Sequence, residues 1–325
     1  MFSRDERTRV LFRKSWEAAA INSGADLRIF CRNFGLFNLL KSICRFIFAQ
    51  PAKRVVFGTT EILLYALFST NKDVWVFTGL GRLLLKNDSF SDYIKIYLRM
   101  LYKKQLIVVL NVHDSDFICS FIAAEPVVLE GEGYPFKDRY KEKEIKSKTS
   151  EIKFAYVGRL LKSKGVDKLV EVFSVASQKD WTLLVVGDAD FSNMDSVSRS
   201  VLKNSADRSV GKIIYTGFSR EVSSILESVD VLISMSEREG LPFAILDGVV
   251  SGAHLVLSPV PGHLAFSGLP GVTFVKPDNL SEIFHNFSVN PLMVKKFDGL
   301  SRYIECKKRF GQTIIIEKIK MILNS

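Results

Sequence analysis

Short apolar runs and amphipathic segments alternate along most of this chain. In its second half, runs rich in valine, isoleucine and leucine predict buried strands, and apolar residues at helical spacing predict helices between them. The predicted strands are 154–157, 181–186, 212–215, 229–233 and 254–257. The predicted helices are 163–177, 193–204, 220–227 and 242–251. Regular alternation of strand and helix predicts a doubly wound parallel sheet.

The first half shows the same alternation less regularly. Strand-like runs occur at 54–57, 74–77 and 106–110, each near a helical segment. No opening strand with a glycine-rich loop is recognisable before them, so the N-terminal half is predicted to be short. Residues 136–150 are polar and highly charged and are the predicted linker. We therefore expect an α/β protein with one domain at 1–150, linker included, and a second at 151–325 that ends in C-terminal helices.

Composition narrows the class of protein. The chain has 325 residues, 47% hydrophobic and 25% charged, which suits two globular domains. No apolar run is long enough to span a membrane and the first residues do not fit a signal peptide, so a cytoplasmic location is expected. The cysteines lack metal-ligand or redox spacing and are expected to be reduced, buried thiols. They are Cys31, Cys44, Cys119 and Cys306.

The net charge of +10 is compatible with an anionic partner. Basic residues punctuate aromatic and aliphatic ones in segments 29–48 and 93–104, a pattern typical of a helix lying on an anionic bilayer. For segment 29–48, a core helix with a solvated basic edge explains the pattern equally well. Because no nucleic-acid-binding motif is recognisable, the membrane surface is favoured and nucleic acid is not expected as a partner.

Residues 234–252 hold the most concentrated candidate chemistry. They follow a predicted strand, turn at Gly240, and continue as a helix that Pro242 suits in its first turn. Gly252 is a plausible C-terminal cap of that helix. In an open α/β sheet, such a turn lies at the carboxyl edge of the strands, where the free N–H groups of a helix bind phosphate. Glu239 in the turn and Asp247 in the helix can line the same crevice.

A second candidate loop follows the predicted strand at 154–157. Arg159 and Lys164 both lie in it. At the carboxyl end of a strand, the planar fork of an arginine and the point charge of a lysine can bracket a diphosphate. Taken alone, Lys164 is better explained as an ordinary surface cation and Arg159 could equally be one, but their position on the same predicted sheet edge as Glu239 favours a shared site.

Taken in order, four motifs carry a resemblance to a known family. They are Gly158-Arg-Leu-x-x-x-Lys-Gly165, Leu183-Leu-Val-Val-Gly187, Tyr215-Thr-Gly217 and Ser236-x-x-Glu-Gly-Leu-Pro-x-x-x-Leu-Asp-Gly-x-x-Ser-Gly252. As a set, over about residues 105–290, they resemble the nucleotide-sugar-binding half of the retaining glycosyltransferases of family four, also called glycosyl transferases group 1. Segments 77–82, 110–114 and 131–133 are similar to parts of bacterial O-antigen and polysaccharide members of that family.

This resemblance implies a GT-B fold, in which two Rossmann-like domains face each other across a cleft, here with an abbreviated N-terminal domain. The acceptor would bind the N-terminal domain and the nucleotide sugar the C-terminal one. The implied catalytic residues are Glu239, Arg159 and Lys164, with the two cations also holding the donor diphosphate. The donor is further contacted by the amides of Gly240, Leu241 and Phe243 and, at its ribose, by Asp247.

The resemblance also implies the reaction. A sugar would pass from a UDP- or GDP-sugar to a lipid-linked saccharide, with retention, without metal or cofactor, during bacterial surface polysaccharide assembly (O-antigen, lipopolysaccharide or capsule). The enzyme would be peripheral on the cytoplasmic face of the inner membrane. Two cations and a helix N-terminus can stabilise the charge of a leaving nucleoside diphosphate. The alternative is a catalytically silent nucleotide-sugar-binding or scaffold subunit at the membrane; an epimerase of the same fold fits the motifs less well.

Several residues depart from the family pattern or permit another chemistry. The family commonly has glutamate where this chain has Asp247, which we expect to loosen the ribose contact. His113 does not match the histidine that many members carry, and we assign it a structural role; His263, in a loop after a strand, is only a weak candidate for approaching the donor. The pairs at 114–116 and 188–190 have the Asp-x-Asp form that binds a divalent cation in another glycosyltransferase fold, although an acidic loop without metal is favoured for the second.

Overall fold

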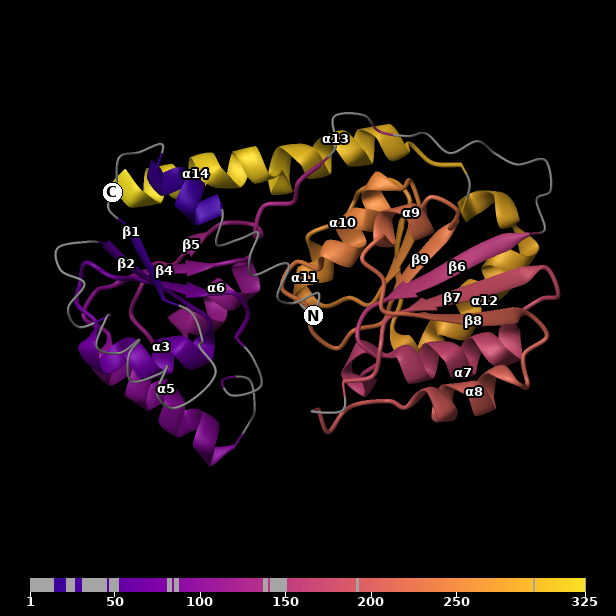
Figure 1. Cartoon of the computed structure of the whole chain (residues 1–325), viewed down its shortest axis with the longest axis horizontal. Coiled ribbons are helices and arrows are strands. Elements are labelled where there is room, and N and C mark those ends of the chain that lie inside the picture. Colours follow the sequence, from indigo (N-terminus) through magenta and orange to yellow (C-terminus); the bar gives the residue numbers. More distant parts are fainter. Residues whose placement is uncertain are drawn as a thin grey trace. The chain divides into compact units, whose positions relative to one another are not determined.

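The computed structural model of this chain describes residues 15–21, 27–30, 46, 53–80, 84, 88–136, 140, 151–190, 193–294 and 296–324. The chain forms two compact units: unit 1 comprises Met1–Pro135 and Arg309–Ser325, and unit 2 comprises Phe136–Lys308 (Figure 1). This division differs from the predicted domain at 151–325, because the last helix packs in unit 1. Most of the predicted linker at 136–150 lies outside the described residues.

The described part of unit 1 contains a five-stranded parallel sheet whose strands follow one another in chain order. The strands are β1 (Leu27–Phe30), β2 (Lys53–Phe57), β3 (Val74–Phe77), β4 (Leu106–Val109) and β5 (Val127–Val128). The three predicted strands correspond to β2, β3 and β4. The absence of a recognisable opening strand was a wrong inference: β1 is present and pairs with β2. The strand has only four residues, one of them Arg28, and its last two had been assigned to the helical segment 29–48, so no strand was recognised there.

Sequential strand order places the helices that connect these strands on one face of the sheet, since parallel crossovers share one hand. The helices α3 (Thr59–Tyr65), α5 (Ser89–Leu101) and α6 (Val112–Cys119) bury their apolar residues there, against alternate strand positions such as Trp75 and Phe77. The intervening positions, among them Val74 and Val76, point to the opposite face. That second face needs a cover from elsewhere in the chain.

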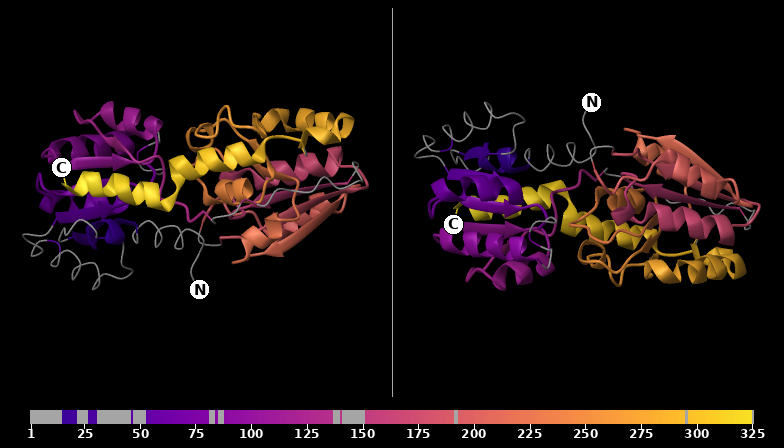
Figure 2. Two further views of the ribbon diagram at one scale, coloured as in Figure 1. Left: turned by 90° about the horizontal axis from the view of Figure 1, so that it is seen from above. Right: turned by 90° about the horizontal axis from the view of Figure 1, so that it is seen from below.

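Two segments distant in sequence cover the second face of the unit 1 sheet. One is the helical stretch 15–21, which contributes the buried Trp16. The other is α14 (Gln312–Asn324), whose buried residues include Ile315 and Ile319 and which lies along the unit 1 strands (Figure 2). The C-terminal helices were predicted as part of the second domain, but α14 packs on the unit 1 sheet.

Unit 2 contains a six-stranded parallel sheet with the order β11-β10-β9-β6-β7-β8. The strands are β6 (Ile152–Val157), β7 (Trp181–Val186), β8 (Lys212–Gly217), β9 (Val231–Ser234), β10 (His254–Leu257) and β11 (Val272–Phe274). The predicted doubly wound arrangement is confirmed: the chain runs outward from β6 to β8 and then returns to β9 on the other side of β6. The strand order therefore reverses between β6 and β9, the position at which ligands bind in such sheets.

Helices cover both faces of the unit 2 sheet (Figure 1). They are α7 (Val166–Ala176), α8 (Arg199–Ala206), α9 (Val222–Leu226), α10 (Phe243–Val250), α11 (Pro261–Leu264), α12 (Leu280–Val289) and α13 (Gly299–Phe310). The helix predicted at 193–204 begins only at Arg199, because residues 195 and 197 hydrogen-bond to the loop after β6 instead. The short β11 and the helix α12 had not been predicted.

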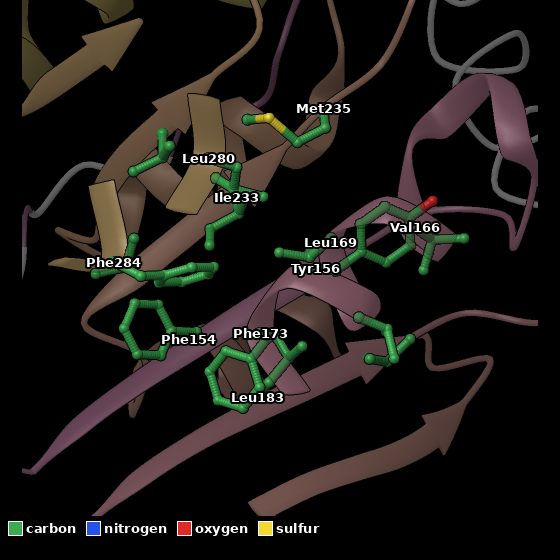
Figure 3. Close-up of a cluster of buried hydrophobic side chains, with 14 of the residues drawn as sticks. Phe154, Tyr156, Val166, Leu169, Phe173, Leu183, Ile233, Met235, Leu280 and Phe284 are labelled. Carbon is green, nitrogen blue, oxygen red and sulfur yellow. The ribbon is translucent and has the colours of Figure 1, made fainter. Parts of the chain in front are cut away.

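The core on the α7 side of the sheet fixes the strands that carry the candidate site. The ring of Phe154 in β6 packs on Phe173 of α7 and Phe284 of α12, with centroids 5.6 and 5.4 Å apart (Figure 3). Trp181 of β7 lies 5.1 Å from Phe154 in the same cluster. Edge-to-face and tilted aromatic pairs of this kind add stability beyond the apolar area that they bury. The ends of β6 and β7 are consequently held on a rigid support.

Unit 2 is expected to lose stability in mild acid because of His254. This histidine at the start of β10 is buried, and desolvation, followed by the charge of Arg302, lowers its pKa to about 4. The unfolded chain therefore takes up a proton near pH 6.5 that the folded protein accepts only near pH 4. The contribution of the neutral His254 to the free energy of unfolding is complete above pH 6.5. It declines by roughly 3 kcal/mol in all as the pH falls from the unfolded-state pKa to the folded-state pKa.

Urea unfolding followed from pH 7 to pH 4.5 measures this effect. The variant His254→Gln is expected to flatten the decline relative to the wild type, whereas His285→Gln, at an exposed position of α12, should leave the profile unchanged. Parallel pH profiles for the wild type and His254→Gln would contradict the prediction.

Candidate active site at the strand-order reversal

The turn between β9 and α10 has the predicted form of strand, turn and helix. Pro242 is the N-cap residue of α10, just before the predicted first turn, and it offers no side-chain cap. At the other end, Gly252 adopts a left-handed φ of 70° and donates to the carbonyl of Val249, while Ala253 donates to that of Gly248. This pair of bonds is a Schellman motif and confirms Gly252 as the helix terminator. The N-terminus of α10 lies at the carboxyl edge of the sheet.

The loop after β6 is held against this turn by a glycine. Gly165 has a φ of 68°, and a Cβ atom at this position would lie 2.4 Å from the carbonyl oxygen of Met235. Only glycine permits this approach, because any side chain would collide with backbone. The amide of Glu237 donates to the carbonyl of Ser163 over 2.9 Å and joins the two loops.

This junction brings two of the predicted site residues together. The Lys164 ammonium Nζ lies 2.6 Å from the Glu239 carboxylate Oε1, and the Ser236 hydroxyl donates to the same oxygen over 2.7 Å. The side chains of Lys164 and Glu239 are 23% and 16% exposed, so the ion pair is partly shielded from water but open to a ligand. A cation and a carboxylate thus stand together where the strand order reverses.

Arg159 occupies the same sheet edge but contacts another carboxylate. Its Nη1 atom lies 3.2 Å from Asp190 Oδ2, and its side chain is 40% exposed. Gly187 allows the loops after β6 and β7 to approach, since a Cβ there would lie 1.8 Å from the carbonyl oxygen of Gly158. Within the loop after β6, the fork of Arg159 is therefore held toward the loop after β7, whereas Lys164 contacts the turn after β9.

The remaining predicted site residues lie on the turn and the helix. Gly240 and Leu241 are in the turn, and Phe243 is the first residue of α10. Asp247 is half-buried one turn further along the helix. Lys164 and the positive end of the α10 dipole therefore lie beside Glu239, and Arg159 lies on the same sheet edge, an arrangement suited to binding a dianionic group there.

The two Asp-x-Asp sequences have other partners. Asp188 pairs with Arg199 and accepts from the amide of Phe218 over 3.0 Å, and Asp190 pairs with Arg159. Asp114, in the other sequence, accepts from the side chain of Asn111, which caps α6, and desolvation raises the pKa of Asp114 to about 6. Across the described residues, no group of three or more histidine, cysteine or acidic side chains is placed to hold a metal ion.

Sequence reasoning assigned no role to several residues of this region. Ser236, which donates to Glu239, stood in a motif without a function of its own, and the spacing Ser-x-x-Glu was the available signal. Asp190 was considered only as part of an Asp-x-Asp pair and not as the partner of Arg159. His263, the weak candidate for approaching the donor, has no exposed surface and contacts Ser234 and Ser258 instead. His113 is exposed near the start of α6.

Two other predictions have mixed outcomes. Cys306 is buried as expected, but Cys119 is exposed, and Cys31 and Cys44 lie outside the described residues. Most of segment 29–48 and Arg82 also lie outside them. Within the part of the chain that the structure describes, no helix has the length and apolar character required to cross a bilayer.

Comparison with protein families identifies the same region. A family model described as Glycosyl transferases group 1 matches residues 151–287, which include the loops after β6 and β9. The amylovoran biosynthesis glycosyltransferase AmsD of Erwinia amylovora is 24% identical over 148 residues, 43% of this chain and 39% of that protein. The chain spans 39 to 55% of the length of the curated relatives it matches, all three of which are named glycosyltransferases.

Solved structures share the fold over nearly the whole chain. HepE of Anabaena in complex with UDP-glucose has a TM-score of 0.70 at 15% identity and covers 97% of this chain and 95% of its own. WaaG, described as a glycosyltransferase involved in lipopolysaccharide biosynthesis, has a TM-score of 0.65 at 13% identity, with coverage of 97% and 96%. At such low identity the likeness establishes the fold, which is GT-B, and nothing finer.

Proposed function

We propose, from the match of residues 151–287 to the Glycosyl transferases group 1 family, that this chain transfers a sugar from a UDP- or GDP-sugar to a lipid-linked saccharide. The observation that carries the proposal is the contact of Lys164 with Glu239 at the strand-order reversal, beside the N-terminus of α10. The complexes of HepE with UDP and UDP-glucose support a nucleotide-sugar donor.

In this proposal the cations act on the leaving group. Lys164 and Arg159 hold the donor diphosphate, and the amides of Gly240, Leu241 and Phe243 face its phosphate and sugar. The bond between the anomeric carbon and the phosphate oxygen breaks, and the electron pair passes to the diphosphate. Positive groups that are already in place stabilise this charge without reorganisation, which is the most effective form of electrostatic catalysis.

The acceptor hydroxyl then replaces the diphosphate on the same face of the sugar. Its oxygen bonds to the anomeric carbon, and its proton passes to the departing phosphate oxygen, so that configuration is retained without a metal ion. Glu239 faces the sugar in this scheme, and Asp247 binds the ribose hydroxyls. The shorter aspartate reaches less far than a glutamate, and the ribose contact is correspondingly weaker.

The decisive experiment incubates the full chain with a panel of nucleotide sugars and lipid-linked acceptors. We expect transfer from one donor, with retention at the anomeric carbon and without added metal. Failure to transfer or hydrolyse any donor would contradict the proposal. Binding of UDP without turnover would instead favour a silent nucleotide-sugar-binding subunit.

The outer face of α5 supports a lipid-linked acceptor and a position at the cytoplasmic face of a membrane. One side of this helix is buried in unit 1, but apolar residues continue around the exposed side: Phe90, Tyr93, Ile96 and Met100 are 62, 71, 53 and 76% exposed. Arg99 and the basic residues after the helix flank them. Exposed aromatic and aliphatic side chains with basic neighbours suit the interface of an anionic bilayer.

Vesicle sedimentation tests this surface. The double variant Tyr93→Ser/Met100→Ser is expected to bind phosphatidylglycerol-rich vesicles at least about tenfold more weakly than the wild type, because two apolar side chains no longer enter the interface. The control is Val175→Ser/Met194→Ser, which removes residues that are 85% and 102% exposed in unit 2. Equal weakening by both pairs, or none by the first, would contradict the assignment.

A further inference from the structure

A carboxylate that takes no part in the proposed chemistry contacts one of the two cations of the candidate site. Asp190 lies in the loop after β7, and its Oδ2 atom is 3.2 Å from Nη1 of Arg159. The side chains of Arg159 and Asp190 are 40% and 27% exposed. An ion pair between side chains as exposed as these is weak. An anion that binds the guanidinium group more strongly can therefore displace this carboxylate.

The backbone, rather than Asp190, fixes the position of Arg159. The Tyr156 hydroxyl donates to the carbonyl of Arg159 over 2.6 Å. The amide of Leu160 donates to a carbonyl of the loop after β7 over 3.0 Å, and its own carbonyl accepts from the amide of Val197 over 2.8 Å. These bonds hold the chain on both sides of the Arg159 side chain, so the arginine reaches the sheet edge without help from the aspartate.

The carboxylates at this sheet edge balance the charges of its cations. Lys164 pairs with Glu239, as Arg159 does with its aspartate, so these four side chains together carry no net charge. Phosphate oxygens bind an arginine best through its planar fork, which offers two parallel N–H groups. Asp190 accepts from the Nη1 side of that fork. Glu239 faces the sugar in the proposed mechanism, whereas Asp190 takes part in none of its steps.

We propose that Asp190 competes with the diphosphate of the nucleotide for Arg159 and thereby limits the affinity of the site for the nucleoside diphosphate. This inference rests on the proposed transferase function. The nucleoside diphosphate is the leaving product of that reaction, and it must dissociate before the next donor binds. A residue that weakens its binding shortens its residence time. Asp190 therefore sets the balance between holding the donor and releasing the product.

Calorimetry with inorganic pyrophosphate, UDP and GDP tests this competition. In Asp190→Asn the amide oxygen can still accept from Arg159 but carries no charge, and Asp190→Ser removes the carboxylate altogether. We expect both variants to bind pyrophosphate, and the nucleotide that the site accepts, about five- to tenfold more tightly than the wild type. The gain should shrink at high salt, because partly exposed charges are screened.

The same variants should have a distinct kinetic signature. With a nucleotide-sugar donor, the KM of Asp190→Asn is expected to fall by about the factor by which UDP or GDP binding tightens, while kcat does not rise. Binding energy that is already present before the transition state does not accelerate the chemical step. A KM equal to that of the wild type would contradict the inference, and a merely structural role would raise KM instead.

The matched control is Asp180→Asn, at an exposed position directly before β7 and so at the opposite end of that strand. Its affinities should equal those of the wild type. In an Arg159→Met background, Asp190→Asn should change affinity by less than about twofold, since no guanidinium remains to compete for. A full gain in that background, or unchanged or weaker binding by both neutral variants, overturns the inference.

Failure of the proposed function gives a different result from failure of this inference. If no donor is turned over but pyrophosphate binding tightens as expected, the competition for Arg159 stands and the transferase assignment fails. If neither the wild type nor the variants bind pyrophosphate, UDP or GDP, Arg159 holds no diphosphate and the inference is overturned.

Discussion

Replacement of Lys164 by methionine is expected to lower sugar transfer by about 100- to 1000-fold, the usual cost of removing one preorganised group that stabilises transition-state charge. Methionine keeps much of the length and apolar volume of the lysine stem but removes the ammonium group 2.6 Å from Glu239. The diphosphate then departs without its nearest cation. Because that charge grows as the bond breaks, most of the loss should appear in kcat.

The control for this variant is Lys168→Met. Lys168 lies in α7, directly after the loop that carries Lys164; it pairs with Asp278 over 3.1 Å and has a side chain that is 56% exposed. Its replacement should leave transfer unchanged, since an exposed ion pair of this kind contributes little. Initial rates over a range of donor concentrations measure both variants. If the kcat of Lys164→Met equals that of the wild type, Lys164 has no role in the mechanism.

Combining Lys164→Met with Glu239→Gln tests whether the two residues act as a unit. Glutamine retains an acceptor for Ser236 but carries no charge, so Lys164 loses its ionic partner. Residues that contact each other are rarely additive. The double variant is therefore expected to be little worse than Lys164→Met alone; losses that multiply fully would indicate independent roles.

The sequence predicted the bounds of strands best where a strand is covered on both faces of the sheet. The predicted bounds of β7 and β10 match the observed ones, because a parallel strand covered on both faces tolerates few polar residues and each of these strands has only one. The turn with Glu239 was equally visible, since glycine and proline mark its ends. Arg159, Lys164 and Glu239 could be assigned to one sheet edge because each follows a predicted parallel strand, and the carboxyl ends of parallel strands lie at the same edge.

Contacts between loops were not visible in the sequence. Lys164 reaches Glu239 because Gly165 adopts a left-handed conformation against Met235, and Arg159 turns to Asp190 because two glycines let their loops approach. The pattern of hydrophobic residues does not indicate which loop residues contact each other. The same limit affected α14: C-terminal helices were predicted, but the sequence did not indicate that the unit 1 sheet buries one of them.

Replacement of Ile319 by aspartate is expected to unfold unit 1 while unit 2 remains folded. Ile319 has no exposed surface and packs with Val74, Val76 and Val108 on the second face of the unit 1 sheet. Loss of its packing costs about 2–5 kcal/mol, and burial of a carboxylate there adds several more. A domain of this size has a free energy of unfolding of about 5–15 kcal/mol, so the two losses together are of similar size.

Met321→Asp supplies the matched control, because Met321 lies two residues further along α14 and is 71% exposed. Limited proteolysis with mass spectrometry distinguishes the units: Ile319→Asp should yield cleavages throughout 53–135 and leave 151–294 protected, and Met321→Asp should resemble the wild type. The strand order of unit 1 gives the reason. Its connecting helices all lie on one face, so the described chain covers the other face only with residues 15–21 and α14. A folded unit 1 in Ile319→Asp would show that this face does not depend on the C-terminal helix.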